Sequence, residues 1–268
     1  MLKKLLLTIS VLLFALVICS SVSAVNGMTE QVNLNTDWGQ PNGDSLNPAI
    51  SQNGTYVTYI PDASNLVPND TNGKSDIFAF NNYTNQTYRV SVNSINGQSN
   101  GNSYNPSISS NGRYIVFDSV ADNLVPFDTN RCSDIFIRDT WTGSITRIGF
   151  NFTVLQLNGN SYNPSISGDG RYIAYEFYNA VLGGSYGPGS IYLYDRIFGN
   201  TTIISPGSDS TNPSISRNGN YVVFESAVNK VVYPDKNNVR DILRYSITDG
   251  TTITVSVDPY GNDADGSS

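Results

Sequence analysis

The chain has 268 residues and a formal net charge of −7, with 22 acidic against 15 basic residues and no histidine. Its lysines and arginines form no basic stripe that would neutralise phosphates, which argues against nucleic-acid binding. The lack of histidine excludes Ser-His-Asp and Cys-His catalysis, as well as histidine-ligated zinc or iron.

Residues 1–24 have the three parts of a signal peptide. Lys3 and Lys4 give a positive start, residues 5–18 form an apolar run, and residues 22–24 are a small-residue cleavage site. The apolar run is shorter than the roughly 20 residues that span a bilayer. We therefore expect cleavage near Val25, no stable membrane span afterwards, and a protein that is secreted or associated with the cell surface. A retained membrane anchor is the alternative.

From residue 46 the sequence repeats one phrase four times. Its clearest copy, at residues 103–117, reads Ser-Tyr-Asn-Pro-Ser-Ile-Ser-Ser-Asn-Gly-Arg-Tyr-Ile-Val-Phe. Its Asn-Pro pair begins at Asn47, Asn105, Asn163 and Asn212, at successive spacings of 58, 58 and 49 residues. A repeat of this length predicts a radial or stacked array of small supersecondary units.

Each repeat carries four strand signals joined by turns. The first strand holds the Asn-Pro pair, because proline is tolerated at the start or the edge of a strand. An Asn-Gly or Asp-Gly pair follows, which predicts a hairpin with a type I′ turn and positive φ at both central residues. The second strand, for example residues 114–117, is almost continuously apolar, as in strands that are covered on both faces. No stretch after the signal peptide has helical periodicity, so we predict an all-β domain.

Four strands per repeat, joined up-and-down, are typical of a β-propeller blade. We therefore predict four four-stranded blades, and the two flanking segments read as parts of further repeats. The blades are residues 46–92, 104–148, 162–204 and 211–257; residues 25–45 are a spare outer strand and loop, and residues 258–268 are a polar tail. Both ends are out of phase with closure. Two arrangements are therefore possible: a compact four-bladed ring, or an open arc of four blades cut from a larger ring. The unmatched segments at the two ends favour the open arc.

The repeated words also resemble a known family. Asn-Pro-Ser-Ile-Ser, Asn-Gly-Arg-Tyr, Asp-Ile-Phe and Thr-Gly are similar to the TolB-like, WD-repeat-like β-propeller repeats over most of residues 33–257. The resemblance implies an extracytoplasmic scaffold or binding module, often one domain of a longer surface protein. It is nearly silent on activity, because this repeat serves many proteins.

The loop between the second and third strands carries the pattern Asp-x-Asn-x-x-x-Asp in three repeats. Carboxylate and amide oxygens at alternate positions of a turn can converge on a hard cation such as Ca²⁺. The candidate calcium ligands are Asp70, Asn72 and Asp76; Asp128, Asn130 and Asp134; and Asp235, Asn237 and Asp241. Plain turn chemistry is the alternative, since Asp and Asn also bond nearby backbone N–H groups. The third repeat lacks these carboxylates, so we expect structural calcium at most and no required cofactor.

Three further carboxylates, Asp118, Glu176 and Glu225, recur at the end of the second strand. Paired carboxylates can perform acid–base chemistry, as in a glycoside hydrolase. These three occupy equivalent places in successive blades, so the symmetry of the repeat predicts that they are held apart. Hydrogen bonds or salt links to neighbouring strands explain them better, and we expect no catalytic residue.

In a propeller, the loops after the second and fourth strands lie on one face. Both sets are rich in Asn, Asp, Gly and Ser here, with Trp38, Tyr104 and Tyr162 nearby. Aromatic rings beside amides can bind sugars or peptides, although exposed tyrosines also serve plain packing. Our interpretation is a binding or scaffolding propeller without catalysis, whose partner is a protein or glycan at the cell surface. The alternative is a carbohydrate-active enzyme, a glycoside hydrolase or lyase, that uses carboxylates of this face.

An open arc has one further consequence. It leaves apolar blade faces at its two ends without a neighbouring blade, and exposed apolar faces promote association. We therefore predict self-association through the open blade edges.

Overall fold

The structure is a computed structural model that describes residues 29–149, 158–180, 187–207, 209–227 and 239–257. The repeats lie in one compact unit that begins at Val32. The predicted signal peptide and the polar tail lie outside the described residues. Within the described ranges, no helix is long and apolar enough to cross a membrane.

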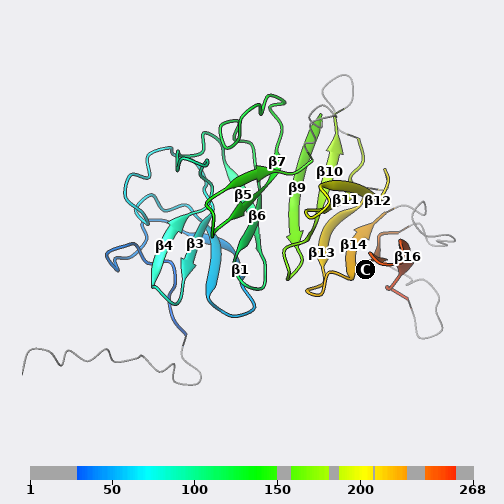
Figure 1. Ribbon diagram of the computed structural model, residues 1–268, viewed down its shortest axis with the longest axis horizontal. Helices are drawn as coiled ribbons and strands as arrows, with labels where there is room; N and C mark the ends of the chain where they lie inside the picture. Colours follow the sequence, from blue (N-terminus) through cyan, green and yellow to red (C-terminus); the bar gives the residue numbers. More distant parts are fainter. Residues whose placement is uncertain (1–28, 150–157, 181–186, 208, 228–238, 258–268) are drawn as a thin grey trace, which may run out of the picture. The chain divides into compact units, whose positions relative to one another are not determined.

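The described residues contain strands and no helix, which confirms the prediction of an all-β domain. Sixteen strands form four antiparallel sheets, and in each sheet the strands pair in the order of the chain (Figure 1). The first sheet has β1 (Ser45–Ile50), β2 (Tyr56–Pro61), β3 (Phe78–Asn81) and β4 (Gln86–Arg89). The second has β5 (Ser103–Ile108), β6 (Tyr114–Ser119), β7 (Asp134–Asp139) and β8 (Ile145–Arg147). The third has β9 (Gly159–Ile166), β10 (Tyr172–Asn179), β11 (Ser190–Asp195) and β12 (Asn200–Ser205), and the fourth has β13 (Thr211–Ile215), β14 (Tyr221–Ser226), β15 (Asp241–Ser246) and β16 (Thr251–Thr254).

The hairpin between the first two strands of each sheet differs from the predicted type I′ turn. Only the glycine has positive φ, for example 75° at Gly112, whereas Asn111 keeps a negative value. The Gly112 N–H donates to the carbonyl of Ser109, and the Asn111 side chain accepts the Ser109 hydroxyl and the Arg113 N–H. The prediction of the hairpin was right and the prediction of its turn type was wrong, because the side-chain bonds of asparagine favour a turn that needs only one left-handed residue.

The hydrophobic core lies between consecutive sheets. One cluster joins Ile60 and Ile77 of the first sheet to Phe117 and Phe136 of the second, whose rings stack at 5.9 Å. Equivalent clusters join the second sheet to the third and the third to the fourth. The second strands of the second and third blades, β6 and β10, therefore contact apolar side chains on both faces, which explains their almost continuous apolar sequence. In β14 of the fourth blade one face is open, and Val223 is 36% exposed.

The sheets are arranged as successive blades that do not close into a ring. Packing contacts join the first sheet to the second, the second to the third and the third to the fourth. Within the described part of the chain, no comparable contact joins the fourth sheet back to the first. The structure thus has the propeller blades that the repeat predicts. The blades form the open arrangement that the unmatched segments at the two ends of the sequence favoured.

The Asn-Pro pairs form the inner strands of the blades. All four pairs line one common cavity of about 390 Å³. Each asparagine has positive φ, between 49° at Asn47 and 54° at Asn212, and each pair interrupts the register with the second strand. A bulge of this kind turns the inner strand locally, and asparagine is one of the few residues that tolerate the left-handed conformation.

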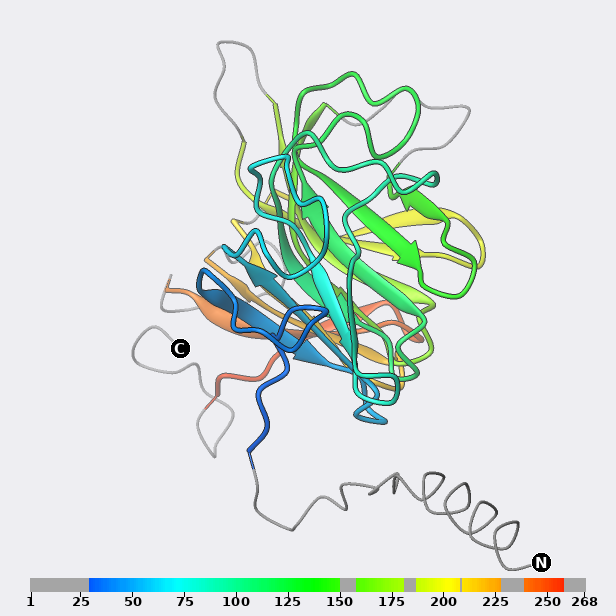
Figure 2. The ribbon, with the colours of Figure 1, turned by 90° about the vertical axis from the view of Figure 1, so that its left-hand side faces the viewer.

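The segment before the first sheet repeats a feature found after it. Residues 32–44 contain no strand, yet the turn at Asn35 has the same bonds as the turn at Asn93. In both turns the asparagine side chain accepts two backbone N–H groups, including that of a glycine four residues later. Val32 packs on the apolar cluster of the first sheet, and the Leu34 carbonyl accepts the Thr87 hydroxyl. In Figure 2, which faces the first sheet, this dark blue segment lies beside its strands.

Candidate functional site

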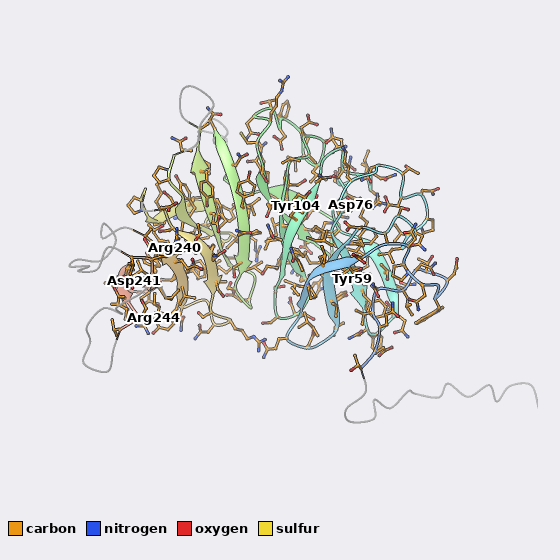
Figure 3. All side chains as sticks on the ribbon, turned by 180° about the vertical axis from the view of Figure 1, so that it is seen from behind. Tyr59, Asp76, Tyr104, Arg240, Asp241 and Arg244 are labelled. Atoms are coloured by element: carbon orange, nitrogen blue, oxygen red, sulfur yellow. The ribbon has the colours of Figure 1, made fainter. Side chains whose placement is uncertain are left out.

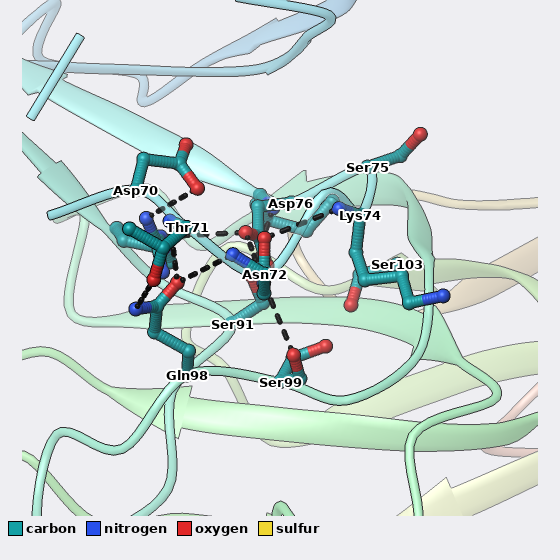
Figure 4. A network of polar contacts seen from close by, with 12 residues as sticks. Asp70, Thr71, Asn72, Lys74, Ser75, Asp76, Ser91, Gln98, Ser99 and Ser103 are labelled. Carbon is teal, nitrogen blue, oxygen red and sulfur yellow. Dashed lines mark hydrogen bonds and ion pairs between the residues drawn. The ribbon is translucent and has the colours of Figure 1, made fainter. Parts of the chain in front are cut away.

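The predicted calcium loop of the first blade surrounds an arginine. Asp70 lies 2.8 Å from Nη2 of Arg89, and Asp76 lies 3.4 Å from its Nε, with all three side chains buried (Figure 4). The Asn72 amide donates to Asp76 at 2.8 Å, and the Ser91 hydroxyl donates to its other oxygen at 2.6 Å. Burial raises the pKa of Asp70 and of Asp76, and the Arg89 guanidinium opposes that rise.

The second loop repeats this arrangement. Arg147 lies 2.8 Å from Asp128 and 3.5 Å from Asp134, and Asn130 donates to Asp134 at 3.2 Å. In both loops the structure brings the three predicted ligands together, and a guanidinium supplies the positive charge that we assigned to calcium. The arginine was visible in the sequence, because it occurs in the fourth strand of both repeats and is replaced by Ile203 in the repeat that lacks the carboxylates.

The third predicted calcium loop is only partly described. Asp235 and Asn237 lie outside the described residues, and Asp241 accepts the Ser256 hydroxyl at 2.8 Å. Among the described residues, no group of three or more histidine, cysteine or acidic side chains is placed to hold a metal ion. Calcium at these loops remains a prediction, because the structure contains protein atoms alone.

The recurring carboxylates at the end of the second strand connect neighbouring blades. Oδ1 of Asp118 accepts the Asn105 amide at 2.9 Å and, from the next blade, the Asn163 backbone N–H at 3.2 Å. Oε1 of Glu176 accepts the Asn163 amide at 2.8 Å and the Asn212 backbone N–H at 2.7 Å. These are the bonds to neighbouring strands that we expected. Asn163 and Asn212 both have positive φ, and each donates its backbone N–H to the carboxylate of the preceding blade.

Asp118 and Glu176 are almost fully buried, at 1% and 3% exposure. Burial raises the pKa of Asp118 to about 6, while the donors Asn105 and Asn163 oppose the rise and the charge of Glu176 adds to it. The two carboxylates are therefore close enough to influence each other. The symmetry argument from the sequence separated them too strictly, because adjacent blades bring equivalent positions together at their inner edges.

The third blade departs from the repeat at this point. Its first two strands, β9 and β10, have eight residues each, whereas β5 and β6 have six. The extra length pairs Tyr178 with Asn160, beyond the last pair that the second blade forms. Tyr178 stands two residues after Glu176, where the second and fourth repeats have Val120 and Ala227. Residues that break the symmetry of a repeat are candidates for function.

The extension forms one side of an open cavity of about 430 Å³ between the second and third blades, which we call the Tyr178 cavity. Its lining residues are Asn105, Asn160, Tyr162, Asn163, Glu176 and Tyr178. The two tyrosine rings lie 6.0 Å apart and are inclined at 58° to each other. The Tyr178 hydroxyl donates to Oε2 of Glu176 at 3.0 Å, and burial followed by the Glu176 charge raises the pKa of Tyr178.

Of the three aromatic residues that the sequence placed on this face, only Tyr162 lines the cavity. Tyr104 is its equivalent in the second blade and is 39% exposed; Figure 3 labels it. Trp38 lies in the turn that precedes the first sheet and is 57% exposed. Tyr178 and Asn160 were not predicted. The signal in the sequence was a tyrosine at a position where the second and fourth repeats have Val120 and Ala227.

Comparisons with known proteins identify the fold. No protein-family model matches the sequence, and no curated protein matches it significantly. The structure of a putative TolB from Agrobacterium tumefaciens superimposes with a TM-score of 0.52 at 17% identity, over 82% of this chain and 67% of that chain. A structure from a study of two prolyl endopeptidases superimposes with a TM-score of 0.51 at 10% identity, over 79% of this chain and 29% of that chain.

These similarities show a TolB-like β-propeller fold, as the repeated words implied. The chain spans about two thirds of the TolB structure and less than a third of the endopeptidase structure. At such low identity a shared fold carries no activity with it. Function therefore has to be argued from the Tyr178 cavity.

Proposed function

We propose that this chain is an extracytoplasmic β-propeller that binds a partner, a protein or a glycan at the cell surface, at the Tyr178 cavity and does not transform it. The signal-peptide pattern of residues 1–24 supports the location. The cavity itself supports binding, because a concave site lined by aromatic rings and amides offers both apolar contact and oriented hydrogen bonds.

One observation carries this proposal. The third blade is the place where an otherwise regular repeat lengthens two strands, and the extra residues form the wall of a cavity. Tyr178 replaces Val120 of the second blade and adds an aromatic ring to the cavity, whereas the neighbouring Phe177 packs in the core between the second and third sheets. Extra strand length that served only packing would need no cavity beside it.

An enzyme is the second candidate, because Asp118 and Glu176 lie near each other and Asp118 has a pKa of about 6. A carbohydrate-active enzyme needs one carboxylate to protonate a leaving group and another to activate water or attack the sugar. Here both carboxylates are buried, and each accepts hydrogen bonds that connect two blades. Because both carboxylates already accept these hydrogen bonds between blades, the arrangement favours binding over catalysis.

The proposal is tested by measuring binding and turnover on the same panel of glycans and peptides. We expect binding without product release, and at least a roughly tenfold loss of affinity in Tyr162→Ala, which corresponds to about 1.4 kcal/mol of lost ring contact. Tyr104→Ala is the matched control, since it changes the equivalent tyrosine of the neighbouring blade outside the cavity. Product release that is abolished in Glu176→Gln would contradict the proposal and support the enzyme.

A further inference from the structure

We propose that the Tyr178 cavity recognises its ligand through a cationic group, an alkylammonium or guanidinium such as that of a lysine or arginine side chain. This inference rests on the proposed binding function and specifies the ligand class. It follows from three features of the cavity: a floor with uncompensated negative charge, walls made of aromatic ring faces, and a surrounding surface with the same sign of charge.

Glu176 forms the charged part of the lining, which we call the floor, and Asp118 lies close enough to Glu176 for their charges to interact. The donors to these two carboxylates are the Asn105 and Asn163 amides, two backbone N–H groups from the next blades and the Tyr178 hydroxyl, all of which are neutral. In the described part of the chain, no lysine or arginine forms an ion pair with either carboxylate.

The contrast with other buried carboxylates of this chain is informative. Asp70 and Asp128 are buried to a similar degree, and each lies 2.8 Å from an arginine of its own blade. Where this protein buries a carboxylate in its first two loops, it places a guanidinium beside it. Glu176, in contrast, lines an open cavity and has no arginine beside it in the described part of the chain. A cationic group of a ligand would form the same kind of ion pair there.

The walls favour a cation as well. The ring faces of Tyr162 and Tyr178 carry negative electrostatic potential, and a cation within about 6 Å of a ring centroid is attracted to it. Both rings line the cavity and their centroids lie 6.0 Å apart, so a cation in the cavity, beside the ring pair, can lie within about 6 Å of both centroids. Two aromatic faces above a carboxylate are a favourable combination for an ammonium or guanidinium, because the rings replace part of its hydration.

Among the residues that the structure describes, the charged groups around the cavity leave its negative charge uncompensated. Arg240 lies close enough to influence Tyr178, but its guanidinium is bound to Asp209 at 3.1 Å and lies 3.8 Å from Glu225. The group of Asp118, Glu176, Asp209 and Glu225 therefore carries more negative charge than one arginine can compensate. An anionic ligand would be repelled, and a neutral ligand would leave the floor uncompensated.

The test compares probes of one shape and different charge by isothermal titration calorimetry on the purified chain. The probes are Nα-acetyl-lysine amide and Nα-acetyl-arginine amide, each with its neutral isostere, norleucine and citrulline derivatives, and Nα-acetyl-glutamate amide as the anion. We expect the two cations to bind at least about tenfold more tightly than their isosteres, and the anion not to bind.

Variants separate the ring faces from the hydrogen bonds. Tyr178→Leu removes a ring face and should weaken cation binding about tenfold, whereas Tyr178→Phe keeps the face and should weaken it less than about threefold. Glu176→Gln should weaken it at least as much as Tyr178→Leu. Glu225→Gln is the matched control, because it neutralises the equivalent carboxylate of the fourth blade, which does not line the cavity, and should weaken binding less than about threefold. Far-ultraviolet circular dichroism verifies that each variant is folded.

The outcomes distinguish this inference from the proposed function. Equal affinity for a cation and its isostere, or a loss in Tyr178→Phe as large as in Tyr178→Leu, would overturn the cationic ligand. Binding of a neutral glycan that Tyr162→Ala abolishes would then leave the binding function intact. If no probe, glycan or peptide binds to a site that depends on Tyr162, both proposals fail.

Discussion

Buried carboxylates of this chain are stabilised in two different ways. Asp70 and Asp128 pair with arginines of their own blade, whereas Asp118 and Glu176 accept hydrogen bonds from neutral donors of two blades. A pair with arginine keeps a carboxylate ionised, while neutral donors compensate burial only in part. The protonation state of Asp118 should therefore change near its raised pKa of about 6.

Asp118 makes the stability of the fold depend on pH. Its folded-state pKa is raised from 3.8 to about 6, so the folded protein holds a proton that the unfolded chain releases between pH 4 and pH 6. Stability should fall as the pH rises through this window, by about 3 kcal/mol relative to an Asp118→Asn variant. Urea unfolding of both proteins at pH 4 and pH 7 measures the difference. Parallel changes in the two proteins would show that the pKa of Asp118 is not raised.

The bulge in each inner strand depends on an asparagine in the left-handed region. Asn163 has a φ of 50° and donates its amide to Glu176. Asn163→Gly and Asn163→Ala both lose this bond, but only alanine meets the steric cost of positive φ. We expect the alanine variant to be less stable than the glycine variant by about 1 kcal/mol. Denaturant unfolding gives the order, and an alanine variant as stable as the glycine variant would contradict this explanation.

At the scale of the element, the loop between the second and third strands is a small ionic core. Arg147 and its partners Asp128 and Asp134 are all buried, and the Asn130 amide adds a hydrogen bond. Removing the arginine would take away the guanidinium charge beside two buried carboxylates. We therefore expect Arg147→Met to destabilise the protein by about 3–5 kcal/mol, as measured by denaturant unfolding.

The control for this prediction is Arg113→Met. Arg113 also pairs with a carboxylate, Asp139 at 2.8 Å, but its side chain is 31% exposed. Solvent screens an exposed pair, so the loss of stability should be much smaller. Equal losses in the two variants would show that the buried pair has no special role in the loop.

The same loops determine what chelation should do. Because Arg89 and Arg147 already place a cation between the two carboxylates of each of the first two loops, we expect EDTA to leave the melting temperature of the protein unchanged. A fall of several degrees in EDTA that Ca²⁺ reverses would instead support the calcium sites predicted from the sequence. Repeating the measurement on Asp241→Asn examines the loop of the fourth blade, which has Thr254 in place of the arginine.

At the scale of the whole compact unit, the outer faces of the first and fourth blades resemble the two sides of a contact between neighbouring blades. Between blades, an isoleucine of the first strand packs on the preceding blade; Ile166 is 6% and Ile215 is 9% exposed. Its equivalent in the first blade, Ile50, has no preceding blade and is 62% exposed. On the fourth blade, Val223 is 36% exposed, whereas its equivalent Val116 is fully buried.

A hydrogen bond between neighbouring blades also has one unmatched half on the open face of the fourth blade. The Ile215 backbone N–H donates to the Ser165 hydroxyl of the preceding blade at 3.0 Å, and Ser214 holds the equivalent position on the open face of the fourth blade. Figure 3 shows Arg240, Asp241 and Arg244 on this blade, at the other end of the unit from Tyr59 on the first sheet. The open ends thus present complementary apolar and polar groups.

We expect residues 25–268 to self-associate through these faces. Sedimentation velocity should show a mass that rises with concentration, because both faces expose apolar residues that equivalent blades bury. Ile50→Glu and Val223→Glu should each leave a monomer, since a charge on either face would be buried on association. Tyr83→Glu, at an 88% exposed turn, is the control and should associate normally. A monomer at every concentration in the unchanged protein would contradict the prediction.

Sequence alone determined the local architecture of this protein. The Asn-Pro and Asn-Gly pairs, the apolar second strands and the four-fold repetition predicted the sheets, the inner strands and the open arrangement, because strand period and turn chemistry act over a few residues. The type I′ turn was predicted wrongly, since φ at Asn111 depends on bonds to Ser109 and Arg113 that composition does not reveal.

Only the tertiary structure decided which distant residues meet. Asn105 and Tyr178 line one cavity although they lie in different repeats, and Arg89 enters the loop of Asp70 from another strand. A repeated sequence states what each blade contains, but the angle between blades determines whether equivalent carboxylates such as Asp118 and Glu176 are near or far. That angle arises from the packing of whole sheets against each other, which no single repeat encodes.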